Sequence, residues 1–258
     1  PGVAASISVD GNMIISGIST LTHLTVLADA TINSITVGEG AGSIAGNTVV
    51  GNSALDAVTT GGANTSIGYQ TLTNNTTGEK NTVVGSQSMY FNTTGNNNTA
   101  IGWNALVENT TADNNTAIGY YALDKNTTGE KNVAVGAIAL DANTTGDNNT
   151  ALGYKALTAN TTADNNTALG YGAMEANTTG TSNTAVGLFA LSYNTTGTQN
   201  TAVGAETLDA GNNTNCNAFG YQALSANTTG ASNCAFGSHA LQLNTTAANN
   251  SAFGHRAL

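Results

Sequence analysis

Hydrophobic and polar positions along this chain follow a unit of about 17 residues that recurs from Asn47 onward. In the copy at residues 115–131, a segment of apolar and small residues from Thr116 to Leu123 precedes a segment rich in Asn, Thr, Gly and charge. The first segment predicts a β-strand, and the second predicts a solvent-facing turn. A helix is disfavoured because the apolar segment is short and is closed by Asn-Thr-Thr-Gly at residues 126–129.

One glycine marks the period of the repeat. Its copies keep a constant spacing, with a single step shortened by one position, at Gly51, Gly68, Gly85, Gly102, Gly119, Gly136, Gly153, Gly170, Gly187, Gly204, Gly220, Gly237 and Gly254. The residue before each glycine is apolar, and the fourth residue after it is Leu or Met. Asn recurs at two further positions. The candidate ladder residues in two successive units are Asn115, Ile118, Gly119, Leu123, Asn126, Asn132, Val135, Gly136, Leu140 and Asn143.

This strict period predicts an all-β fold, a parallel β-solenoid (β-helix) with coils of about 17 residues. Coils stacked at about 4.8 Å would make a rod roughly 60 Å long. We expect Ile118 and Leu123 to fill the interior, and Asn115 and Asn126 to link coils through stacked amides. The glycine column requires a positive φ or the close approach of another backbone.

Residues 1–46 lie outside the repeat. Two strand-like runs, residues 7–9 and 13–15, flank a turn signal at residues 10–12. A mostly alternating apolar pattern follows, and four glycines between Gly38 and Gly46 predict a joint. We therefore divide the chain into an N-terminal β-rich cap, neck or attachment segment (residues 1–46) and a β-solenoid repeat region (residues 47–258).

Aromatic residues recur immediately after the repeat glycine. A single thin rod would expose them in a line, whereas a bundle of three rods would bury them, and large exposed apolar lines mark interfaces. We therefore expect a homotrimer, with interchain contacts at Tyr69, Trp103, Tyr120, Tyr154 and Tyr171.

Composition narrows the classes of partner. The chain has a net charge of −10 and only five Lys and Arg residues, which argues against nucleic acid and anionic membrane surfaces. No apolar run approaches the roughly 20 residues that span a bilayer, so we expect no membrane insertion. The Asn- and Thr-rich composition raises the alternative of disorder, but the recurring apolar columns argue against it.

The phrase Asn-Thr-Ala-Ile-Gly at residues 115–119 resembles the head repeats of YadA-like trimeric adhesins. The full unit, with Gly-Tyr-x-Ala-Leu and Asn-Thr-Thr-Gly, is more similar to repeat tracts of bacteriophage tail fibres and other virion fibres. This resemblance implies a trimeric, β-helical structural fibre, a rod-like shaft of a virion appendage or an extracellular, cell-surface adhesin. A host surface receptor would then be bound through a region not in this chain.

The sequence offers little chemistry for catalysis. The three histidines, His23, His239 and His255, form no grouping with Ser, Cys or Asp typical of a nucleophile, so we expect no enzyme and no cofactor. His239 and His255 fall in adjacent coils, but surface histidines explain them as well as a metal pair does. The Asp-Asn-Asn runs at residues 113–115, 147–149 and 164–166 resemble calcium-loop fragments, yet they lack the spacing of a complete loop. We expect no metal site.

Cys216 and Cys234 lie near the Thr position of adjacent coils. Stacking would bring them close, so they form a candidate disulfide, although small side chains filling a ladder explain them too. The shortened coil that contains Cys216 lacks the usual Asn-Thr-Thr-Gly and is the expected local irregularity.

Three alternatives remain open. Leu258 ends partway through a unit, so we expect either further sequence in the parent protein or end-to-end polymerisation into a self-assembling filament. Asn-Thr-Thr at Asn92, Asn109 and Asn126 matches the glycosylation sequon, although an internal Asn ladder explains the same residues. An ice-binding solenoid would need Thr on an outward strand face, whereas Thr127 and Thr128 lie in a predicted turn.

Overall fold

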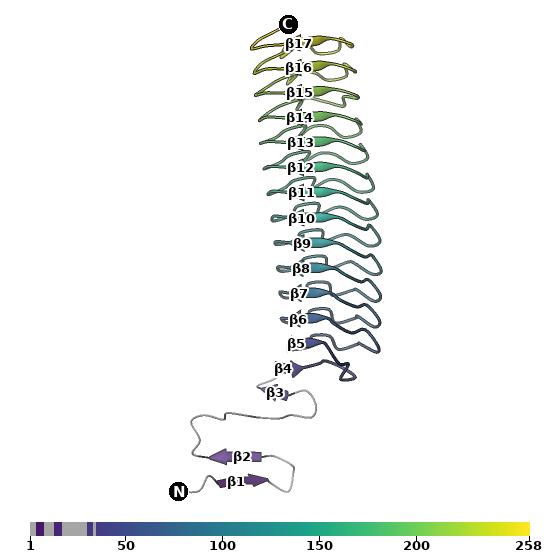
Figure 1. Cartoon of the computed structure of the whole chain (residues 1–258), viewed down its shortest axis with the longest axis vertical. Coiled ribbons are helices and arrows are strands. Elements are labelled where there is room, and N and C mark those ends of the chain that lie inside the picture. The colour runs from purple at the N-terminus through teal and green to yellow at the C-terminus, as the bar shows by residue number, and fades with distance from the viewer. Residues whose placement is uncertain (1–3, 8–12, 17–29, 33–34) are drawn as a thin grey trace.

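The fold is a rod of stacked β coils. The computed structural model describes residues 4–7, 13–16, 30–32 and 35–258. In this part of the chain every regular element is a β-strand, and successive strands rise along the long axis of the rod (Figure 1). No helix among the described residues is long and apolar enough to cross a membrane.

Seventeen strands are described. They are β1 (Ala4–Ile7), β2 (Met13–Ser16), β3 (Ala30–Ile32), β4 (Ile35–Gly38), β5 (Thr48–Gly51), β6 (Thr65–Ile67), β7 (Thr82–Val84), β8 (Thr99–Ile101), β9 (Thr116–Ile118), β10 (Val133–Val135), β11 (Thr150–Leu152), β12 (Thr167–Leu169), β13 (Thr184–Val186), β14 (Thr201–Val203), β15 (Asn217–Phe219), β16 (Cys234–Phe236) and β17 (Ser251–Phe253).

Fifteen strands, β3 to β17, form one sheet in sequence order. From β5 onward every pairing is parallel, with each strand paired to the equivalent residues of the next coil, as Ala117 is to Ala134. The predicted parallel β-solenoid, with its coil length, is therefore confirmed. From β5 onward each strand is only three or four residues long, because a glycine at positive φ ends its extended segment.

The N-terminal strands pair differently. β1 and β2 form an antiparallel pair, and the turn signal predicted at residues 10–12 lies outside the described residues. β4 pairs antiparallel with both β3 and β5, so this hairpin extends the solenoid sheet at its first coil. The proposed division between residues 46 and 47 stays a prediction.

We call the residues that occupy the same place in successive coils a column, and name each column after its member in residues 115–131. The interior is made of three apolar columns, those of Ala117, Ala122 and Leu123, whose members in this coil are fully buried. The columns of Asn115 and Asn126 are buried beside them. Each coil thus contributes methyl, leucyl and amide groups side by side to the core, and each kind of group stacks on its own kind along the rod.

The prediction that Ile118 fills the interior is wrong. Ile118 is 37% exposed, and Val135, its counterpart in the next coil, is half-buried. Successive side chains of a strand point to opposite faces, and the narrow coil admits only a small side chain inward. Ala117 takes that place, so its neighbours Thr116 and Ile118 face outward.

The two Asn columns link the coils in different ways. Asn126 Nδ2 donates to Asn109 Oδ1 at 3.1 Å and to the carbonyl of Gly129 at 2.9 Å, so this column is an amide ladder as predicted. Asn115 Oδ1 instead accepts the backbone N–H of Asn132 at 2.9 Å. The Asn residues of this column from Asn75 to Asn227 are buried with their side-chain amides hydrogen-bonded, so in the folded rod these nitrogens are not accessible to a glycan.

The glycine column meets both predicted requirements. Gly119 has a φ of +141°, and a Cβ added to it would lie 2.5 Å from the carbonyl oxygen of Gly136. The backbone that approaches so closely belongs to the next coil of the same chain. The glycines therefore set the stacking distance within the rod, and the contact is not one between chains.

Candidate functional site

The outward face of the solenoid sheet presents three columns. The Thr116 and Ile118 columns alternate with the buried Ala117 column along each strand. The Tyr120 column follows directly after the glycine, and its predicted members Tyr69, Trp103, Tyr120, Tyr154 and Tyr171 are 42–53% exposed. We call these three columns the sheet stripe.

Rings within the stripe stack along the rod axis. Trp103 lies on Tyr120 with ring centroids 5.2 Å apart, and Tyr154 lies on Tyr171 at 5.3 Å. Phe236 and Phe253 of the Ile118 column stack at 5.3 Å. The structure places the five predicted aromatic residues at the surface in one line, and their contact with another chain stays a prediction.

The sheet stripe carries no Asp, Glu, Lys or Arg between Thr48 and His255, although the chain has a net charge of −10. The charged residues of the repeat region lie instead on the turns and corners. Burial of an uncharged face costs little desolvation, whereas burial of unpaired charges is costly. The stripe is therefore the surface of this rod best suited to contact an apolar or weakly polar partner.

The Asp-Asn-Asn runs have a structural role. Asp147 Oδ1 accepts the backbone N–H of Glu130 at 2.7 Å, and Asp164 Oδ1 accepts that of Asp147 at the same distance. Asp113 does the same for Asn96. Each carboxylate thus satisfies an amide of the preceding coil. These bonds to backbone amides account for the Asp-Asn-Asn runs without a calcium loop.

A denser group of charges lies at one corner of the rod. Lys125 Nζ bonds Asp124 Oδ2 at 2.9 Å and Glu108 Oε1 at 3.0 Å. Burial raises the pKa of Asp124, a shift that Lys125 partly opposes. Burial, with a smaller contribution from Asp124, raises the pKa of Asp141 to about 6.

The candidate disulfide is not formed in the structure, where Cys216 and Cys234 are free thiols. Their columns differ: Cys216 occupies the Asn115 column, and Cys234 occupies the Thr116 column, where it pairs with Asn217. Cys216 replaces the amide by donating from Sγ to the carbonyl of Gly230 at 3.2 Å.

The irregular coil lies where the sequence predicted it. Between β14 and β15, Thr201 pairs with Asn217, one position earlier than the period of the other coils requires. Gly211 stands where the Asn126 column needs an amide, and Asn194 Oδ1, the last acceptor before it, is buried without a partner in the described chain. The amide ladder is therefore interrupted at this coil.

His239 and His255 lie close, with ring centroids 5.7 Å apart, and His239 Nδ1 is hydrogen-bonded to Ser238 Oγ at 2.8 Å. Among the described residues, no group of three or more His, Cys, Asp or Glu side chains could hold a metal ion. His23 lies outside the described residues.

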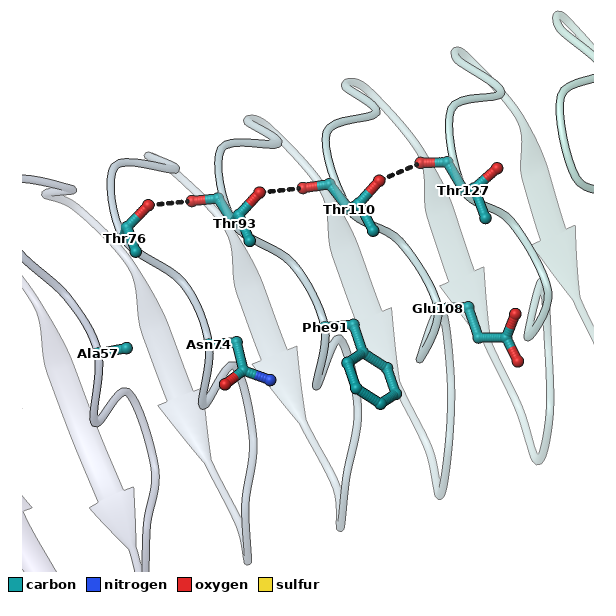
Figure 2. A pocket seen from close by; sticks show the side chains of 8 residues that line it. All are labelled: Ala57, Asn74, Thr76, Phe91, Thr93, Glu108, Thr110 and Thr127. Carbon is teal, nitrogen blue, oxygen red and sulfur yellow. Dashed lines mark hydrogen bonds between the residues drawn. The ribbon is translucent and has the colours of Figure 1, made fainter.

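Two threonine columns have different roles. The Thr127 column lies in the turn, as predicted, and most of its hydroxyls donate to a backbone carbonyl of the next coil, for example Thr93 to Thr110 at 3.0 Å (Figure 2). The Thr116 column faces outward from the sheet, a placement that the sequence reasoning missed. The recurring small residue at the next position was the available signal, because a column of small residues marks the inward position.

The role of the chain is therefore inferred from these structural features, because comparison with known proteins identifies no similar one. No family model matches the chain, and no curated protein and no solved structure shows significant similarity to it.

Proposed function

We propose that this chain is a length of the shaft of a homotrimeric fibre. The supporting observation is the continuity of the ladders: thirteen parallel strands, β5 to β17, repeat one backbone geometry along the rod. From Asn75 to Asn194, neighbouring coils are tied by strand pairing and by two Asn columns. A structure built in this way resists bending and keeps its ends a fixed distance apart, which is what a fibre shaft must do.

The resemblance of the repeat to virion fibres and YadA-like adhesins supports the same role. In this proposal the shaft belongs to a virion appendage or a cell-surface fibre that serves attachment. It holds a receptor-binding part, which lies outside this chain, away from the particle or cell. The proposed function is structural and does not involve catalysis.

The sheet stripe supports the assembly of identical chains. Thirteen coils at about 4.8 Å and three columns about 10 Å wide give an area on the order of 600 Å² per chain. This approaches the roughly 800 Å² that each partner contributes to a standard interface. Another copy of this chain also has the same repeat along its axis, so matching side chains can meet in every coil.

Sedimentation analysis tests the assembly. We expect the intact chain to sediment with the mass of three copies. The double variant Ile101→Glu, Ile118→Glu should reduce this to one copy by placing charges on the stripe. The matched control Ala142→Glu, Ala159→Glu adds the same charges in the Lys125 column, where Glu108 already occurs, and should remain trimeric. A single-chain mass for the unaltered protein would contradict the trimer, and rods that lengthen with concentration would favour the self-assembling filament.

A second candidate, ice binding, gains support from the Thr116 column. From Thr48 to Thr201 this column holds Thr in nine of ten coils, with Val133 as the exception, all on an outward sheet face. Regularly spaced hydroxyls and methyls on such a face can order water. Freezing hysteresis in a solution of the intact chain, abolished by Thr99→Tyr together with Thr116→Tyr, would establish this function. If no freezing hysteresis is measured, the fibre shaft remains the proposed function.

A further inference from the structure

Two adjoining pockets open outside the sheet stripe, further along the corner that carries Lys125. Glu175 lines the first pocket, and Glu206 and Asp209 line the second. Their volumes are about 310 and 240 Å³, and both are also lined by Phe189, Ser192 and Tyr193. These residues belong to three successive coils. The pockets therefore form one trough along the rod axis, with carboxylates at its two ends and aromatic rings between them.

The carboxylates of this trough outnumber the cations near it. Glu175 Oε1 is paired with Lys155 Nζ at 3.0 Å, but no Lys or Arg occurs between Lys155 and Arg256. Within the described ranges, neither Glu206 nor Asp209 forms an ion pair. Burial raises the pKa of Asp209 to about 6, and the charge of Glu206 adds to this shift. A cation in the trough would offset both the burial and the repulsion of these carboxylates.

A buried hydroxyl lines the middle of the trough. Ser192 is only 6% exposed and contributes to both pockets. Its Oγ has no hydrogen-bond partner in the described part of the chain, whereas Thr158 of the same column donates to the carbonyl of Ile138 at 3.0 Å. Buried polar groups are nearly always paired. Because Ser192 lines both pockets, an N–H donor in the trough can supply the partner.

Aromatic rings separate the two ends of the trough. Tyr193 is 68% exposed, so its ring is open to a ligand. Phe189 packs edge to face against Tyr171 at 5.2 Å, and its ring covers Gly172. A Cβ added to Gly172 would lie 2.6 Å from Cε1 of Phe189 and 3.3 Å from Oε2 of Glu175, so the ring edge and this oxygen are close neighbours. Aromatic rings beside carboxylates are suited to an organic cation, which the ring faces attract.

We propose that the trough binds a linear polyamine laid along the rod axis. One ammonium group meets Glu175, and another meets Glu206 and Asp209 at the opposite end. The methylene chain between them packs on Phe189 and Tyr193, and the buried hydroxyl accepts a hydrogen bond from a nitrogen. The two ends lie two coils apart, roughly 10 Å, which suits a chain with several charged nitrogens better than a single ion.

A metal ion fits this trough less well. Among the described residues, no group of three or more His, Cys, Asp or Glu side chains could hold one. The proposed site goes beyond the shaft function and does not depend on trimer formation, because it lies outside the sheet stripe.

Isothermal titration calorimetry of the full chain with spermidine tests the proposal. We expect a saturable signal that fits one site per chain. The double variant Glu206→Gln, Asp209→Asn should weaken binding by about tenfold or more, the effect of losing hydrogen bonds to charged groups. Gln222 Nε2 donates to Glu206 Oε2 at 2.6 Å, and a glutamine at position 206 keeps an acceptor for it.

The matched control Asp147→Asn, Asp164→Asn removes the same two charges from turns outside the trough. Asn96 already shows that an amide serves in this column, because its Oδ1 accepts the backbone N–H of Glu79 at 2.8 Å. The control should change the dissociation constant by less than about twofold. Equal weakening by the two double variants would show that spermidine responds only to net charge, and would overturn the proposal.

Tyr193→Ala tests the aromatic contact. Ala176 and Ala210 occupy the same column in the neighbouring coils, so the substitution keeps the fold. We expect binding about fivefold weaker, and no change in the control Phe91→Ala, which removes a ring from the same column at a distant coil. The proposal is overturned by the absence of a saturable signal in folded protein, by unchanged affinity in Tyr193→Ala, or by Mg²⁺ alone binding as tightly as spermidine.

Discussion

Asn126 donates from Nδ2 to Oδ1 of Asn109, the equivalent residue of the preceding coil, at 3.1 Å. The same bond recurs between Asn143 and Asn126 at 2.8 Å, so each amide both donates and accepts. Buried amides are costly when unpaired and become part of a stable core only when every member has a neighbour. The polar half of this core therefore depends on repetition.

Asn126→Ala should lower the free energy of unfolding by about 1–3 kcal/mol, the cost of leaving one buried polar group unpaired. Asn109 Oδ1 loses its donor, whereas the Gly129 carbonyl keeps Asn115 Nδ2 and Asn143 Nδ2 keeps the Gly146 carbonyl. Urea denaturation followed by circular dichroism provides the measurement. The control Asn74→Ala, in a column where Ala142 already occurs, should change stability by less than about 0.5 kcal/mol. Equal losses in the two variants would contradict the amide ladder.

Leu123→Ala should cost about 2–5 kcal/mol, the usual penalty for truncating a fully buried leucine. Leu243→Ala removes the same atoms from a side chain that is 79% exposed and should cost less than about 0.5 kcal/mol. The two variants are compared by their midpoints in urea. A small effect at Leu123 would mean that this column is not the apolar core.

Gly119→Ala should be among the most damaging single changes. The left-handed φ alone costs on the order of 1–3 kcal/mol for an alanine, and the new Cβ would also press on the Gly136 carbonyl of the next coil. We expect a clear fall in melting temperature. Gly62→Ala is the control, because a Cβ there meets nothing nearer than 3.7 Å, and it should melt like the unaltered chain.

Cys216→Asn should stabilise the rod by about 0.5–1.5 kcal/mol, because asparagine restores the amide that the Asn115 column uses in other coils. Burial raises the pKa of the Cys216 thiol, so in the native protein we also expect it to react slowly with thiol reagents. Reductant should leave the melting temperature unchanged. A shift on reduction would instead indicate a disulfide that the structure does not contain.

Acidification from about pH 7.5 to about pH 4.5 should raise the melting temperature. Burial raises the pKa of Asp141 and Asp209 to about 6, from the ordinary value of 3.8. The folded state therefore binds more protons than the unfolded state between about pH 4 and 6, so this contribution is full below that window and is lost as pH rises through 6. The double variant Asp141→Asn, Asp209→Asn should show less of this gain. An unchanged pH profile in the variant would assign the effect to other groups.

The fold could be predicted because a ladder requires the same residue in every coil. The spacing of Gly119 and its copies gives the coil length, and Asn126 indicates stacked amides. The direction in which Ile118 points could not be read from hydrophobicity, since the width of the coil decides it. The Ala117 position, which holds a small residue in nearly every copy, indicates which side of the strand faces the interior.

The pairing between two columns at the charged corner was beyond prediction for a related reason. Lys155 and Glu175 form an ion pair at 3.0 Å although one coil plus three positions separate them along the chain, and only the three-dimensional register shows that their columns face each other. The residues of both columns also vary from coil to coil. Neither periodicity nor composition distinguishes a variable column that pairs with another from one that is merely exposed.

We expect the shortened coil between β14 and β15 to divide the described rod into two cooperative blocks. In a one-dimensional stack, fraying that begins at one end spreads by breaking one interface after another. At this coil the amide ladder is already interrupted, so the three coils from β15 to β17 can open without drawing the longer block after them. The weakest cross-section of the described rod thus lies between β14 and β15, and we expect the block from β5 to β14 to keep its length when the coils beyond it open.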